Sequence, residues 1–168
     1  MNIRDAILAG HSKARTQAIV EYVRDDPEKF AELMRLFLGN VYRITQRAGW
    51  PLSDAVKRHP ELIHPYFPQL IRQLRRDDVH VAVRRNVVRL LQFVEIPKRY
   101  RGRIFEACYN LLADPEQPVA VRCFSMTVAV NIAKSEPDLL DEIRLVATEH
   151  PQLLTAGMRA RLRKHFGS

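Results

Sequence analysis

An internal repeat of thirty-eight residues constrains the fold of this chain more than any other feature of its sequence. In this register Phe67 aligns with Phe105, and the run VAVR at 81–84 aligns without a gap with the run VAVR at 119–122. Each copy has the apolar spacing of two amphipathic helices joined by a short turn. Repeats of this kind bury their apolar faces only against neighbouring repeats. The sequence therefore predicts an all-α, right-handed α-solenoid.

A third and more diverged copy aligns at an offset of thirty-seven residues, which places Leu33 on Leu70. We therefore expect about three helix pairs in a single domain of residues 1–168, with helical caps at about 1–25 and 151–168. One arginine occupies the same place in the second helix of each copy. The three members of this arginine ladder are Arg47, Arg84 and Arg122.

Three local features lead to more detailed expectations. Pro51 lacks a backbone N–H, so it should bend or break the helix that begins near Asn40. The helix at about 79–94 is apolar on most sides and is expected to be the central helix of the stack. Tyr42 and Tyr109 fall on apolar stripes, which predicts buried rings with a solvated hydroxyl group.

The charge of the chain is basic and unevenly distributed. The net charge is +8, and ten Lys or Arg against three acids between residues 72 and 103 give that segment a net +7. A second basic cluster, at 159–164, lies near the end of the chain. A basic surface attracts phosphates and acidic protein segments, although arginine is also common on solvated helix faces.

The third copy resembles the HEAT-repeat superfamily, with Asp114, Val119 and Arg122 at the places of the acid, valine and arginine of a HEAT unit. Longer phrases, FAELM at 30–34, TQRAGWPLS at 45–53 and RLLQF at 89–93, resemble a small family of bacterial HEAT-repeat proteins of the Bacteroidetes lineage. The resemblance covers nearly the whole chain and implies an all-α solenoid. It brings no established activity, so no functional residue is carried over from it.

A second comparison is with the HEAT-like DNA alkylation-repair glycosylases, which are also basic helical-repeat proteins. This likeness is one of fold, which is weak support for function. Such enzymes need a carboxylate and an aromatic side chain that converge in a basic groove. Trp50 is the sole tryptophan, and the sequence identifies no such pair.

The arginine ladder has two interpretations. Arg47, Arg84 and Arg122 could line one surface and bind anions on a partner. Alternatively, each could pair with the acid or the carbonyl groups of a repeat turn, with Asp77 or Asp78 for Arg84 and Asp114 or Glu116 for Arg122. We favour the second interpretation, in which the ladder is structural.

Other basic residues are better candidates for binding a partner or a phosphate group. Arg85 and Arg89 are one helical turn apart and share a helix face. If second helices line the concave surface, these two arginines lie at its centre. The full candidate set is Arg43, Arg85, Arg89, Lys98, Arg99, Arg101 and Arg103. Trp50 could contact a partner or could fill the gap at a helix bend.

No catalytic, metal or cofactor motif emerges from the spacing of the polar residues. The histidines lack the partners of a tetrahedral metal site, and no glycine-rich phosphate loop is present. The sequence contains no membrane-length apolar run and no recognisable secretion signal, and Cys108 and Cys123 fit buried free thiols. We therefore expect a cytoplasmic protein without a metal, a cofactor or a membrane contact.

These observations favour a non-catalytic scaffold that presents a basic concave surface to a protein partner. The alternative is sequence-independent nucleic-acid binding through an arginine-rich groove, which would weaken steeply with salt. An alkylation-repair glycosylase is a distant third interpretation.

Overall fold

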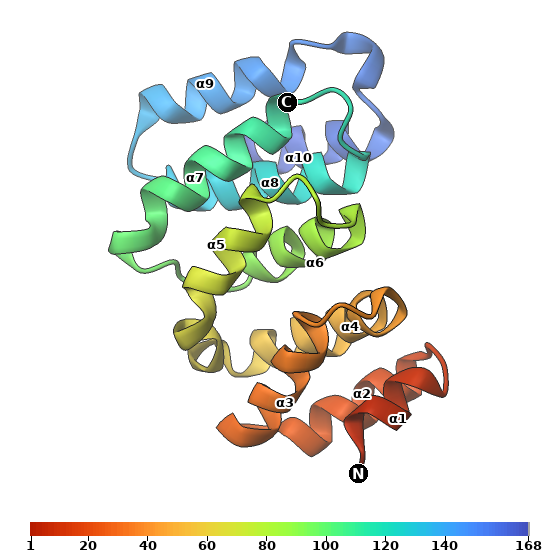
Figure 1. Cartoon of the computed structure of the whole chain (residues 1–168). Helices are drawn as coiled ribbons and strands as arrows, with labels where there is room; N and C mark the ends of the chain where they lie inside the picture. The colour runs from red at the N-terminus through yellow and green to blue at the C-terminus, as the bar shows by residue number, and fades with distance from the viewer. Residues whose placement is uncertain (168) are drawn as a thin grey trace. The chain divides into compact units, whose positions relative to one another are not determined.

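The computed structural model describes residues 1–167, and in this part of the chain every regular element is a helix. The chain divides into two compact units, one at Met1–Glu95 and one that begins at Ile96. The predicted all-α class and the repeated helix pair are confirmed (Figure 1).

The first unit contains an N-terminal pair of helices followed by two copies of the repeat, the second of which begins with a 3₁₀-helix. Its helices are α1 (Ile3–Leu8), α2 (Lys13–Val23), α3 (Pro27–Phe37), α4 (Tyr42–Arg58), the 3₁₀-helix η1 (Pro60–Tyr66), α5 (Phe67–Arg75) and α6 (Val81–Leu91). Side chains cap several helix starts. The carboxylate of Asp26, for example, accepts hydrogen bonds from the backbone N–H groups of Glu28 and Lys29, and Pro27 follows at the first helical position.

Within the first unit, α4 has neighbours on most of its sides. It packs against α1, α2, α3, η1 and α6. Ile44, Ala48, Leu52 and Val56, spaced by one helical turn each, are fully or almost fully buried along it. In this unit, α4 rather than α6 is therefore the helix around which the core forms.

A break of α4 at Pro51 and a buried ring of Tyr42, both expected from the sequence, are wrong. The helix continues without a break through Pro51, which is buried inside it. The loss of one backbone N–H is tolerated there because Leu52, Ala55 and Val56 beyond it are buried and hold the last turns in place. Tyr42 is 46% exposed rather than buried, because it lies in the first turn of α4, ahead of the buried stripe.

The thirty-eight-residue register is reproduced in three dimensions. The elements η1 and α5 together cover 60–75, and the same positions one repeat later are the single helix α7 (Lys98–Ala113). The first copy begins as a 3₁₀-helix because Pro65 and Pro68 lack the N–H groups of an α-helix, whereas α7 has Arg103 and Glu106 at those places. The second helices, α6 and α8 (Val119–Ile132), begin at equivalent residues.

The second unit is formed around α8. This helix packs against α7, α9 (Pro137–Thr148) and α10 (Ala156–Phe166), with the 3₁₀-helix η2 (Pro151–Leu153) between the last two. Tyr109 on α7 is half-buried. Cys108 and Cys123 are buried free thiols, and burial raises the pKa of Cys108 to about 12, so its thiolate form is suppressed.

A close approach of two helices fixes the position of α6 against α4. A Cβ atom on Gly49 would lie 2.3 Å from the side-chain Cγ of Asn86, so only glycine fits at this place on α4. The amide of Asn86 is buried and donates to the carbonyl oxygen of Gln46 at 3.5 Å. Gly49 and Asn86 therefore mark the point where the two second helices touch.

Candidate binding surface on α4 and α6

Each arginine of the ladder donates a hydrogen bond to a carbonyl group at the C-terminal end of a helix. Arg84 on α6 donates to the carbonyl of Arg76, the residue after α5, at 2.7 Å. Arg122 on α8 donates from Nε to the carbonyl of Leu112, in the last turn of α7, at 2.9 Å. The last carbonyls of a helix have no partner within it, and a positive charge there complements the helix dipole. In these two copies the arginine of the second helix caps the first helix.

The first copy of the repeat differs. Arg47 on α4 donates to the carbonyls of Ile7 and Leu8 at 3.3 and 3.0 Å, so it caps α1 rather than α3. The hydroxyl group of Thr45 instead donates to the carbonyl of Gly39, after the end of α3, at 3.0 Å. All three ladder arginines thus donate to backbone groups of their own unit.

The two second helices of the first unit run side by side in the same direction. Tyr42 and His80 have ring centroids 4.2 Å apart near their N-terminal ends, and Lys57 lies over Phe93 near their C-terminal ends. We call the solvent-facing surface between these contacts the α4–α6 face. It is formed by Arg43, Trp50, Asp54, Lys57, Arg85, Arg89 and Phe93.

Trp50 lies at the centre of the α4–α6 face and is 46% exposed. The guanidinium carbon of Arg89 lies 3.9 Å from the centroid of the indole ring, a close cation–π contact. The ring of His11 meets the indole edge-on at 5.3 Å. Trp50 does not fill an interior gap, because the indole lies at the surface.

A second cation–aromatic pair lies beside the first. Nζ of Lys57 is 4.3 Å from the ring centroid of Phe93, which is 39% exposed. The same ammonium group lies 3.3 Å from Oδ1 of Asp54, so this carboxylate already has an ion-pair partner on its own helix. Asp54 follows Trp50 by one helical turn on α4.

Two of the three arginines of α6, Arg85 and Arg89, form no ion pair within residues 1–167. Within residues 1–167, the side chains of Arg85 and Arg89 form no hydrogen bond and no salt bridge. Burial lowers the pKa of Arg89, which Asp54 partly opposes and Arg85 reinforces, although a guanidinium stays charged throughout the physiological range. Arg43 is exposed and lies two turns before Trp50 on α4.

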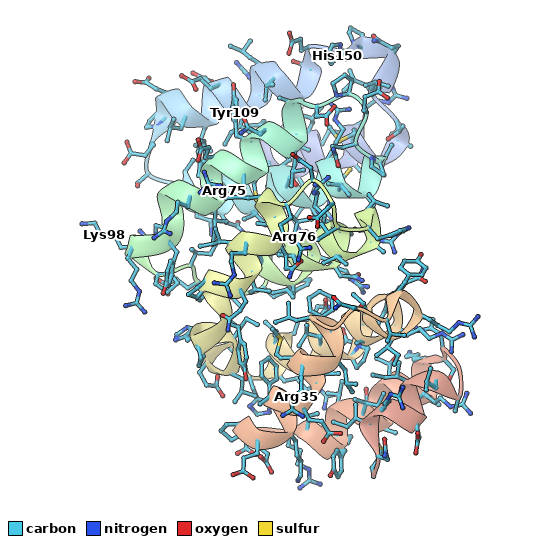
Figure 2. The ribbon with its side chains drawn as sticks, in the orientation of Figure 1. Arg35, Arg75, Arg76, Lys98, Tyr109 and His150 are labelled. Carbon is cyan, nitrogen blue, oxygen red and sulfur yellow. The ribbon has the colours of Figure 1, made fainter. Side chains whose placement is uncertain are left out.

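The remaining candidate residues belong to the second unit. Lys98, Arg99 and Arg103 are exposed on α7, and Lys98 projects outward from its first turn (Figure 2). Arg101 donates from Nε to the carbonyl of Ile96 at 2.9 Å, which closes the start of α7. The candidate set is therefore divided between the two units, with Arg43 on α4 and Arg85 and Arg89 on α6 in the first unit.

A polar hollow of about 170 Å³ lies elsewhere in the first unit, between the turn after α3 and the turn after α5. Tyr42 and His80 form one wall, and Nδ1 of His80 accepts the backbone N–H of Ala82 at 3.1 Å. Arg76 and Asp78, which also line it, are joined by two hydrogen bonds. The charges of this pair compensate each other, so the hollow offers less to a charged ligand than the α4–α6 face.

The contacts across the α4–α6 face escaped prediction, although the repeat contained a signal for them. Trp50 and Arg89 are thirty-nine residues apart, and Lys57 and Phe93 are thirty-six apart, both close to the repeat offset. Residues at that separation lie at similar heights on neighbouring second helices. Pairing aromatic and basic residues at this separation would have identified both contacts.

Two other kinds of feature are missing from the described residues. Among residues 1–167, no three His, Cys, Asp or Glu side chains are arranged to hold a metal ion. None of the helices in this part of the chain combines the length and the apolar character needed to cross a membrane.

Comparison with known proteins gives one match. A family model described as a HEAT repeat domain matches residues 3–165, which includes nearly all of both units. No curated protein and no solved structure matches the chain.

Proposed function

Since the chain belongs to the HEAT-repeat family, whose repeats commonly mediate protein interactions, we propose that it is a non-catalytic scaffold that binds a protein partner through the α4–α6 face. The choice of the α4–α6 face as the binding site rests on the contacts of α4 and α6 described above.

The observation that carries the proposal is the exposed Trp50 with Arg89 stacked on it. Tryptophan and arginine are the residues most enriched among those that dominate binding energy at protein interfaces. Because Arg89 and His11 already hold the indole in place, less side-chain freedom is lost when a partner binds. A prearranged aromatic–arginine pair on a rigid helix pair suits a partner that docks without rearrangement.

Nucleic-acid binding is the main alternative, since the same face is basic. Proteins that bind single strands present open aromatic rings on which bases stack. Here a cation lies over the ring of Trp50 and another over the ring of Phe93. The face thus offers prearranged cations rather than open rings, which favours a protein partner.

The proximity of Trp50, Asp54 and Arg89 supports a second candidate function, an alkylation-repair glycosylase. The carboxylate of Asp54 is exposed and paired with Lys57, which weakens its suitability for stabilising charge in a desolvated groove. The test is the release of alkylated bases from methylated duplex DNA. Activity that is lost in Asp54→Asn would establish the enzyme; its absence in the native protein removes this candidate.

The scaffold proposal is tested by affinity capture from extracts of the native cell. The native chain, the variant Trp50→Ala and the control Leu145→Ala would be compared, Leu145 being 66% exposed on α9. We expect a protein that the native chain and the control retain and that Trp50→Ala loses. The same three proteins would be titrated with labelled single- and double-stranded DNA and RNA over a salt series. Tight binding that falls with salt, together with partner capture indifferent to Trp50, would replace the scaffold by nucleic-acid binding.

A further inference from the structure

The charges of the α4–α6 face are unevenly neutralised. Lys57 is paired with Asp54, but Arg85 and Arg89 have no carboxylate within ion-pair distance in residues 1–167. The surrounding unit adds to this imbalance, because Met1–Glu95 has sixteen Lys and Arg against eleven Asp and Glu, a net charge of +5. A half-buried positive face with unpaired guanidinium groups attracts carboxylates and orients their approach.

The contact with Trp50 determines how Arg89 can bind a carboxylate. The guanidinium carbon of Arg89 lies 3.9 Å from the centroid of the indole ring, and its N–H groups donate no hydrogen bond within the described chain. A guanidinium held over a ring keeps its fork of donors for other groups, and this fork matches the two oxygens of a carboxylate. Arg85 lies one turn earlier on α6, so the Cβ atoms of the two arginines are about 6 Å apart.

We propose that the segment bound by this face is an acidic peptide that presents two carboxylates to Arg85 and Arg89. This inference rests on the proposed scaffold function and specifies its partner. Acidic residues one turn apart on a helix, or alternate residues of an extended strand, have side chains about 6–7 Å apart and match the two arginines. The exposed parts of Trp50 and Phe93 flank the arginines and would contact the apolar stems of the same segment.

The probe is poly-L-glutamate, titrated into the full chain by calorimetry and by fluorescence. Trp50 is the sole tryptophan, so its emission reports on the site directly. We expect saturable binding that weakens with salt and a change in the emission of Trp50. The variant Arg85→Glu/Arg89→Glu should bind at least about tenfold more weakly.

Two further variants separate specific pairing from general charge. Arg35→Glu/Arg72→Glu makes the same change of net charge on exposed residues of α3 and α5, the first of which is seen in Figure 2. This control should bind within about threefold of the native chain. Arg89→Lys keeps the charge but removes the planar fork, and we expect affinity about tenfold lower. Circular dichroism and melting temperature would establish that each variant is folded.

Several results would overturn the inference. The first is equal loss of binding in the two double variants, which would make net charge the cause. The second is full affinity in Arg89→Lys. The third is tighter binding of inorganic polyphosphate or poly(U) than of poly-L-glutamate at about 150 mM salt, which would identify phosphate as the ligand chemistry. If poly-L-glutamate fails to bind while partner capture still depends on Trp50, the acidic partner is wrong and the scaffold stands. Capture indifferent to Trp50 contradicts the scaffold itself.

Discussion

At the scale of single residues, the contact between Gly49 and Asn86 determines how closely α4 and α6 approach. We predict that Gly49→Ala is destabilising, because its Cβ would lie 2.3 Å from Cγ and Nδ2 of a buried side chain. Overpacking of this kind outweighs the better helix propensity of alanine, for a net loss of about 1–2 kcal/mol in the free energy of unfolding. Urea denaturation would measure the difference.

The chain offers a matched control for this substitution. Gly102 lies inside α7, and a Cβ atom added there would have nothing within 4 Å, so Gly102→Ala should be neutral or slightly stabilising. In a background of Asn86→Ala, the cost of Gly49→Ala should shrink, because the clashing amide is gone. An undiminished cost in that background would show that the clash is not its source.

His165 gives the fold a dependence on pH. Burial lowers its pKa below the ordinary histidine value, and Lys164, Arg161 and Lys134 lower it further. Its Nε2 is 2.9 Å from the hydroxyl oxygen of Thr127, which also accepts a hydrogen bond from Arg161. A protonated ring would bring another donor to this crowded oxygen. Because the folded form takes up the proton less readily than the unfolded chain, the native state should lose stability as pH falls below about 6.5, and the loss should level off below the folded pKa.

The measurement is the free energy of unfolding between pH 7 and pH 5 for the native chain and for His165→Gln. The substitution should flatten the dependence, because glutamine keeps a polar group near Thr127 without titrating. Identical pH profiles for the two proteins would contradict this role of His165.

At the scale of helices, the ladder arginines connect neighbouring helices, and one of these is too short to be stable alone. The helix α1 has six residues, which is too short to be stable alone, and Arg47 donates to two of its last carbonyls. We predict that Arg47→Met speeds amide hydrogen exchange across α1 by about tenfold or more while exchange in α3 changes little, since a lost hydrogen bond to a charged group costs about 1.5–3 kcal/mol. Equal acceleration in α1 and α3 would show that Arg47 acts on the whole unit instead.

The sequence predicted elements better than it predicted contacts. The offset of thirty-eight residues located the start of α8 from that of α6, because aligned repeats share their turn chemistry. Pro51 was misjudged because its local effect is outweighed by the burial of Leu52 and Val56, which depends on neighbours distant in sequence. The stacking of Arg89 on Trp50 likewise depends on the approach of α4 to α6, which Gly49 permits and which no local pattern specifies.

At the scale of the whole molecule, chemistry is concentrated on one face of the first unit. The described chain offers no metal cluster among residues 1–167, and its ladder arginines are engaged by backbone carbonyls. The recognition groups that we propose are the pair Arg85 and Arg89 with the exposed Trp50. A helical scaffold that carries its recognition groups on rigid second helices accounts for the positions of Arg85, Arg89 and Trp50.

The most direct test of this account is photo-crosslinking in the native cell, with a photoreactive phenylalanine analogue placed at position 93, at position 35 or at position 145. The analogue at position 93 keeps a phenyl ring on the α4–α6 face and leaves Trp50 in place. We predict that position 93 captures a defined protein, whereas Arg35 on α3 and Leu145 on α9, both exposed, do not when replaced in the same way. Crosslinks to the same protein from all three positions, or to nucleic acid alone from position 93, would contradict the claim that the α4–α6 face is a protein-binding surface.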